Sequence, residues 1–148
     1  MSIQEKKTVL NMTSGWVIFV AYAFYLSQNY SEELTSTPVD IKFWASAFLI
    51  LIPVSIVARI IIHIIFAIVT KVATDEDLNY KEDERDKMIQ LRSVRNSMFM
   101  FAAGFLLSMV AVVMDAQPYM MFVIIAIGGL MAETMEGLTA LYYYRRGF

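Results

Sequence analysis

Four ionisable side chains lie inside two otherwise apolar segments, and they are the groups in this chain that could do chemistry. Arg59 and His63 lie in one of these segments, and Glu133 and Glu136 lie in the other. A charged group in the hydrocarbon of a bilayer costs about 2.5–3.5 kcal/mol even on insertion scales. Such groups therefore face protein or a cavity, where they pair with each other or bind an ion or a proton.

The spacing within each pair predicts an intramembrane charge cluster. Arg59 and His63 are four residues apart, and Glu133 and Glu136 are three apart, so each pair shares one face of a helix. We expect Arg59 to pair with Glu133, and His63 to pair with Glu136. Two interpretations stay open: a structural ion pair that fixes helix packing, or an ion or proton site that uses the carboxylates and the histidine. No recognised metal-ligand motif accompanies these residues, so no metal site is predicted.

The composition sets the class of protein that must position these groups. Of the 148 residues, 58% are hydrophobic and 18% are charged, whereas soluble domains have about 45–50% and about 25%. This balance predicts an integral membrane protein, and the length predicts one domain, 1–148. The chain has no cysteine, which excludes disulfides and thiolate metal sites.

Four apolar segments are long enough, or nearly so, to cross a bilayer as helices. A spanning helix needs about 20 mostly apolar residues. The predicted spans cover 8–28, 43–69, 98–114 and 119–144. The first is long for the apolar part of a signal peptide and lacks a good cleavage site, so we expect it to be retained. The predicted fold is an all-α, integral membrane four-helix bundle.

The distribution of lysine and arginine predicts the orientation. Ten of the twelve basic residues precede the first span, lie between the second and third spans, or follow the fourth. Because cytoplasmic segments carry the excess of Lys and Arg, we expect both termini to be cytoplasmic, with the chain in the cell inner membrane. The second and fourth spans then run in the same direction, and the members of each expected pair, Arg59 with Glu133 and His63 with Glu136, differ in depth by only about 3–5 Å.

Small residues share one helix face with Glu133. At about 100° per residue, Ala126, Gly129, Gly137 and Ala140 fall on one narrow stripe. Small residues let another helix backbone approach closely within a membrane. The stripe therefore predicts close packing against the second span or against the fourth span of a second copy. It favours a homodimer, or another membrane protein, as the partner.

A charged segment, 75–96, lies between the second and third spans and has the pattern of an amphipathic helix. Basic residues form one stripe, and apolar residues form the stripe beside it. We expect a cytoplasmic helix that lies in the headgroup region and runs on into the third span, or else a surface for docking a partner. Its basic residues are too few, and too well balanced by acidic ones, to predict nucleic-acid binding.

Two short charged motifs flank the last two spans. The motif "DERD" precedes the third span, and "YYYRRGF" closes the fourth. Through these motifs, the second half of the chain resembles a group of small bacterial inner-membrane proteins with a DERD-type motif and a Tyr-Arg-Arg-Gly-type tail. The resemblance implies a four-helix membrane protein with no established activity, and it assigns no catalytic residue. We expect the two motifs to pair at the cytoplasmic surface through Asp83, Glu84, Arg85, Asp86, Arg145 and Arg146.

The sequence favours a function without catalysis. It has no cysteine, a single histidine, and no phosphate loop, GxSxG or HExxH motif, so no enzyme and no cofactor are predicted. Nine of its eleven methionines are scattered through the apolar spans, where core packing explains them better than copper binding. Two functions stay open. One is an accessory or interaction protein, which we favour, and the other is a minimal dimeric transporter or channel that uses Glu133, Glu136 and His63.

Overall fold

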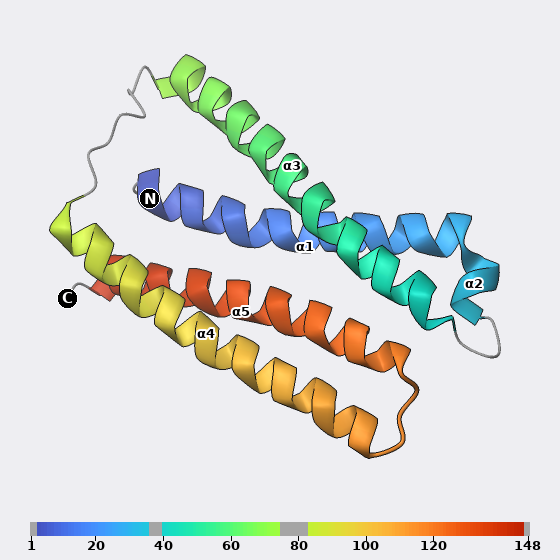
Figure 1. Cartoon of the computed structure of the whole chain (residues 1–148). Coiled ribbons are helices and arrows are strands. Elements are labelled where there is room, and N and C mark those ends of the chain that lie inside the picture. Colours follow the sequence, from blue (N-terminus) through green and yellow to red (C-terminus); the bar gives the residue numbers. More distant parts are fainter. Residues whose placement is uncertain (1–2, 36–39, 75–82, 147–148) are drawn as a thin grey trace.

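The computed structural model describes residues 3–35, 40–74 and 83–146, and most of these residues lie in helices (Figure 1). Four of the helices are long and apolar enough to cross a membrane. The prediction of an all-α chain with four such helices is therefore confirmed for the described residues, which contain no strand. The helices are α1 (Ile3–Asn29), α2 (Ser31–Thr35), α3 (Ile41–Thr74), α4 (Glu84–Val113) and α5 (Tyr119–Arg146).

The helix α4 begins fourteen residues before the predicted third span and runs through it without a break. Asp83 caps its first turn: the Asp83 carboxylate accepts a hydrogen bond from the Glu84 N–H at 2.7 Å. Asp86 reaches back to the Asp83 N–H at 3.4 Å and completes a capping box. Such a box satisfies backbone donors that the helix itself cannot pair. The first part of the expected cytoplasmic helix, 75–82, lies outside the described residues.

The helices α4 and α5 form an antiparallel hairpin, and both chain ends lie at the opposite end of the bundle from the hairpin turn (Figure 1). The turn closes α4 with Asp115 in the left-handed conformation, at φ 59°. The Asp115 N–H bonds the Val112 carbonyl, and the Ala116 N–H bonds the Ala111 carbonyl. This pattern is a Schellman motif, which usually places glycine at the left-handed position.

Two glycines hold the hairpin together along its length. A side-chain carbon built on Gly104 would lie 3.0 Å from the Cα of Gly128, and one built on Gly128 would lie 3.3 Å from the Cα of Gly104. The two backbones thus approach as closely as small residues permit. The sequence drew attention to Gly129, but its neighbour Gly128 makes the contact.

Aromatic side chains join the helices at the end that carries the hairpin turn. Trp44 of α3 stacks on Tyr119 of α5, with ring centroids 4.9 Å apart. One turn further along, Phe48 packs against Phe122, with centroids 6.1 Å apart. The Tyr22 hydroxyl of α1 donates to the Ala47 carbonyl of α3 at 2.7 Å. These contacts bring α1, α3 and α5 together here, whereas α3 diverges toward the end with both termini (Figure 1).

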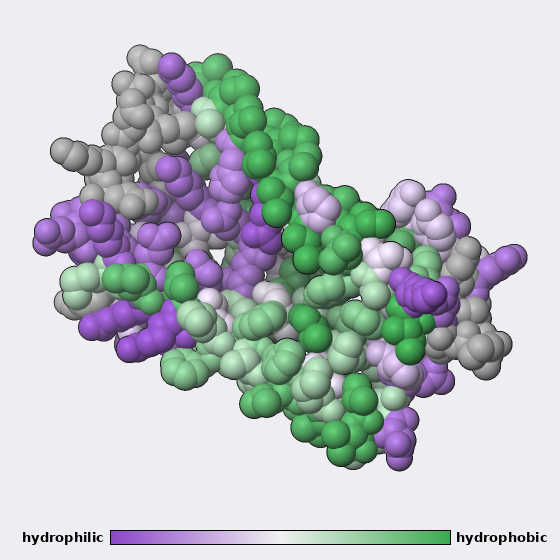
Figure 2. All heavy atoms as spheres, in the orientation of Figure 1, coloured by the Kyte–Doolittle hydropathy of each residue, from purple (hydrophilic) through white to green (hydrophobic). Residues whose placement is uncertain are grey.

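The outer surface of the bundle is apolar over most of its length. Figure 2 shows hydrophobic side chains covering α3 and much of the hairpin, with hydrophilic ones gathered toward the end with the termini. None of the most apolar stretch of α3 is buried inside the protein. Exposed apolar side chains on α3 include Leu49, Ile50, Ile60, Ile61, Ile64 and Ile65. A surface of this extent requires an apolar solvent, so the fold is that of a multi-pass membrane protein.

The glycine contact predicts different effects for two alanine substitutions. Gly104→Ala places a methyl group against the Gly128 backbone and should destabilise the hairpin by about 1–3 kcal/mol. Gly129→Ala is the matched control, because nothing lies within 4 Å of a carbon built there. It should leave stability unchanged or raise it by about 0.5–1 kcal/mol through helix propensity. Thermal unfolding in detergent measures both effects, and equal shifts for the two variants would contradict the proposed contact.

Candidate functional site: an ionic clamp and a polar cavity

Arg59 of α3 and Glu133 of α5 form a bidentate ion pair near the middle of the bundle. Arg59 Nη1 donates to Glu133 Oε1, and Arg59 Nη2 donates to Glu133 Oε2, each at 2.6 Å. The two side chains are 34% and 21% exposed, so the pair is partly shielded by protein. The planar guanidinium matches both carboxylate oxygens, which is the strongest geometry for such a pair. We call the Arg59–Glu133 pair the ionic clamp.

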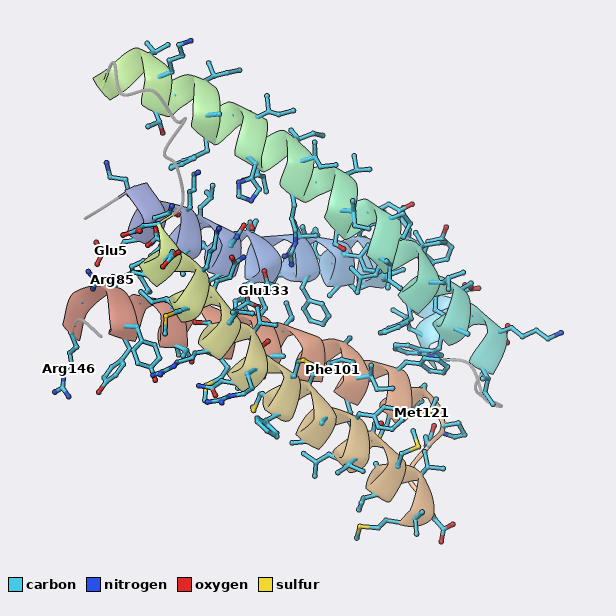
Figure 3. All side chains as sticks on the ribbon, turned by 60° about the vertical axis from the view of Figure 1, so that its left-hand side comes forward. Glu5, Arg85, Phe101, Met121, Glu133 and Arg146 are labelled. Atoms are coloured by element: carbon cyan, nitrogen blue, oxygen red, sulfur yellow. The ribbon has the colours of Figure 1, made fainter. Side chains whose placement is uncertain are left out.

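The backbone of α1 passes directly over the ionic clamp. A side-chain carbon at Gly15 would lie 2.6 Å from Glu133 Oε2 and 3.2 Å from Arg59 Nη2. Glycine is therefore the residue that leaves room for the paired groups. Beside it, the Trp16 indole N–H donates to the Thr134 hydroxyl at 2.9 Å. Three helices meet at the clamp, and Figure 3 shows Glu133 between α1 and α5.

The helices α1 and α5 pack antiparallel in one register along their length. Near the end with the termini, Arg145 Nε lies 3.6 Å from Glu5 Oε1. Further in, a side-chain carbon on Gly137 would lie 3.2 Å from the Met12 sulfur. Gly15 then meets Glu133. Each step forward on α1 matches a similar step backward on α5, so the depth of a residue on one helix fixes its neighbours on the other.

His63 does not pair with Glu136, which corrects our expectation. The His63 Nε2 atom lies 2.6 Å from Oδ1 of Asn11, on α1. No ion pair joins His63 and Glu136 in the described part of the chain. The cause is the course of α3: beyond Arg59 it diverges from α5, so a side chain one turn further on meets α1 instead (Figure 1). Equal depth was a necessary condition for pairing, but not a sufficient one.

A cavity of about 750 Å³ lies beside the ionic clamp and extends toward the end with the termini. It is lined by all four long helices, and Glu136 is one of its walls. Glu136 is partly buried, and no Lys or Arg among the described residues forms an ion pair with it. Figure 2 shows hydrophilic residues gathered on the same part of the molecule. The polar and charged lining residues include Lys7, Asn11, Asp86, Gln90, Ser93 and Ser97.

The stripe of small residues beside Glu133 faces α1 and the cavity. Gly137 packs against Met12 of α1, and Ala140 is buried and lines the cavity. Gly129 has open space beside it and also lines the cavity, and Ala126 lines a smaller one next to it. The expected contact with the second span is thus made by the first helix instead. Sequence reasoning missed Gly15, although it lies in the uncharged first span at the depth of Glu133.

The two charged motifs that flank the last two spans do not pair with each other as we expected. Arg145 lies against Glu5, and Arg146 stacks its guanidinium over Tyr142, 5.3 Å from the ring centroid. Within the described ranges, no ion pair joins either arginine to the segment 83–86. Asp83 and Asp86 are occupied with capping α4. Glu84 and Arg85 are exposed, and Figure 3 shows Arg146 pointing away from the bundle.

The residues that the structure describes hold no group of three or more His, Cys, Asp or Glu arranged to bind a metal ion. No protein-family model, curated protein or solved structure matches this chain. The two features that remain are an ion pair that joins helices and an acidic cavity beside it. The function of the site is therefore argued from this geometry alone.

The ionic clamp predicts a strongly non-additive double-mutant cycle. Arg59→Leu and Glu133→Leu each leave one charge buried without its partner, and each should destabilise the protein by about 3–5 kcal/mol. The double variant replaces both charges with apolar groups and should recover most of that loss. Thermal unfolding of the four proteins in detergent measures the coupling. Losses that simply add in the double variant would show that the two side chains act independently.

Proposed function

We propose that this chain is a non-catalytic accessory or interaction protein of the cell inner membrane, with both termini in the cytoplasm. The ionic clamp is the observation that carries the proposal. Glu133 uses both oxygens on Arg59, and α1 covers the pair. Each charge is neutralised by the other, so the pair serves helix packing rather than the capture of an ion.

The orientation rests on where the basic residues lie. Nine of the ten basic residues assigned to the cytoplasm fall within the described ranges, and they lie at the end of the bundle that holds both termini. The hairpin turn at the opposite end carries Asp115 and no basic residue. An excess of Lys and Arg on one side is the usual mark of the cytoplasmic face.

The first turns of α4 supply a surface for interaction. Leu91 is 71% exposed and Met98 is 67% exposed, and both lie on a helix that also carries Arg92 and Arg95. Apolar and basic residues side by side suit the headgroup region of a bilayer or a membrane-bound partner. A second copy of the chain is a candidate partner, since α3 presents an uncovered apolar face.

A second candidate function is a minimal dimeric transporter or channel that uses Glu136 as an ion or proton site. Glu136 favours it, because this carboxylate lines the cavity and has no ion-pair partner among the described residues. An intramembrane carboxylate without a partner is costly and is typically kept for transport or binding. Glu133 and His63 are not assigned to this transport function, because Glu133 is paired with Arg59 and His63 is hydrogen-bonded to Asn11.

The orientation predicts which introduced cysteines are accessible from outside. The chain contains no cysteine, so single substitutions give an unambiguous signal. Gln117→Cys, in the exposed hairpin turn, should react with a membrane-impermeant maleimide in intact cells. Glu84→Cys, at the start of α4, should react only after the membrane is permeabilised. The reverse pattern would overturn the proposed topology.

The two candidate functions predict different behaviour in sealed liposomes that contain a pH-sensitive dye. An accessory protein should let protons in no faster than protein-free liposomes after an external acid step. A proton pathway through Glu136 should speed acidification, and Glu136→Gln should abolish the increase. An uncoupler added at the end shows that the liposomes were sealed. Proton entry that depends on Glu136 would replace the accessory function with the transport function.

A further inference from the structure

The cavity beside the ionic clamp carries an unbalanced negative charge. Five charged side chains line it: Lys7, Arg59, Asp86, Glu133 and Glu136. Arg59 and Glu133 neutralise each other through the clamp. The remaining groups are one cation and two carboxylates, so the cavity has a net charge of one negative unit. A space of this kind attracts a cation and repels an anion.

Glu136 supplies the negative charge in the inner part of the cavity. It is the neighbour of Gly137, which packs on Met12 of α1. Lys7 lies five residues before Met12, which places it about 7.5 Å nearer the end of the bundle. Asp86 lies in the first turn of α4 and takes part in its capping box. Beside the clamp, Glu136 is therefore the carboxylate that a bound cation would meet.

Two serine hydroxyls lie on the same wall as Glu136, and Ser97 is within hydrogen-bonding reach of its carboxylate. The Ser93 hydroxyl donates its proton to the Ile89 carbonyl at 2.9 Å, and the Ser97 hydroxyl donates to the Val94 carbonyl at 2.9 Å. Both residues line the cavity, but Ser93 is only 1% exposed, so Ser97 is the one whose oxygen is more accessible. The Glu136 carboxylate and the Ser97 oxygen form a set of acceptors on this wall. Such a set selects a ligand with N–H or O–H donors, and the carboxylate favours one that is charged.

Part of the remaining wall is apolar and includes an aromatic ring. Met12, Met98 and Phe101 line the same cavity. Thioethers adapt to irregular apolar groups, and an aromatic face attracts a cation. The volume of about 750 Å³ is in the range that holds a small organic molecule. A bare metal ion would need several oxygen ligands at short range, and the described residues provide no such cluster.

We propose that this cavity binds an organic ammonium ion, with Glu136 as its anionic partner and the oxygen of Ser97 as an acceptor for one of its N–H groups. The apolar part of the ligand then lies against the methionines and Phe101. This site goes beyond the proposed accessory function and does not depend on it. The ammonium group can come from a free amine or from the headgroup of phosphatidylethanolamine, and the two sources share the same chemistry.

Equilibrium dialysis with labelled 4-phenylbutylammonium tests the proposal on the whole protein in phosphatidylcholine nanodiscs, with empty nanodiscs subtracted. We expect saturable binding by the natural protein and binding about tenfold or more weaker in Glu136→Gln, because a charge-assisted hydrogen bond is lost. Glu84→Gln is the control, since this exposed carboxylate lies outside the cavity. The alcohol 4-phenylbutanol and the trimethylammonium analogue, which lacks N–H groups, should both bind more weakly. An absence of saturable binding, or equal binding by Glu136→Gln, overturns the proposal.

Two further measurements keep the test decisive if Glu136→Gln fails to fold. Gly129 lines the cavity and has open space beside it. Gly129→Phe places a phenyl ring in that space and should abolish binding although Glu136 is still present. In the natural protein, bound amine should protect Glu136, but not Glu84, from a hydrophobic carbodiimide, as read by peptide mass spectrometry. Protection of neither residue, or of both alike, contradicts the site. Phosphatidylethanolamine is then added to the nanodiscs. If it competes with the amine, the lipid headgroup is the source of the ammonium group; if it does not compete, the source is a free amine.

Discussion

The bundle depends on one constraint: a charge placed among apolar helices must be paired. Arg59 and Glu133 satisfy it with two parallel hydrogen bonds of 2.6 Å. Both hydrogen bonds of the pair lengthen if α3 slides along α5, so the pair fixes the position of α3 along α5. It also restricts α1, because the backbone at Gly15 lies against both paired groups. One ion pair thus fixes the relative positions of three helices that otherwise present mainly apolar surfaces to each other.

The two ends of the bundle differ because different contacts hold them. Near the hairpin turn, the stacked rings of Trp44 and Tyr119 and the facing glycines at 104 and 128 bring the helices close. Beyond the ionic clamp, α3 turns away and touches α1 through a hydrogen bond between His63 and Asn11. Divergence leaves space, and polar and apolar side chains both surround it. The clamp is therefore both the last close contact between α3 and α5 and one wall of the cavity.

The sequence predicted the elements better than the contacts between them. Apolar length is a property of a single segment, so the four long helices were predictable. The depth of a residue also follows from one segment, and it selected Arg59 and Glu133, which the structure brings together. The rotation of a helix about its axis and its angle to its neighbours depend on the whole bundle. For that reason the partner of His63, and the choice between Gly128 and Gly129, could not be predicted from spacing alone. The capping role of Asp83 and Asp86 was available in the sequence, as acidic residues three apart before a helix.

Glu136 is the residue that packing does not explain. An apolar side chain three residues from Glu133 would cost nothing in a bilayer, whereas a carboxylate without a partner costs several kilocalories per mole. The ionic clamp makes this contrast sharper, because Arg59 already donates from both of its Nη atoms to Glu133. Arg59 forms no ion pair with Glu136. A carboxylate held beside a satisfied ion pair, with a serine hydroxyl as its neighbour, lacks a positively charged donor among the described residues. The proposed ammonium ligand supplies this donor.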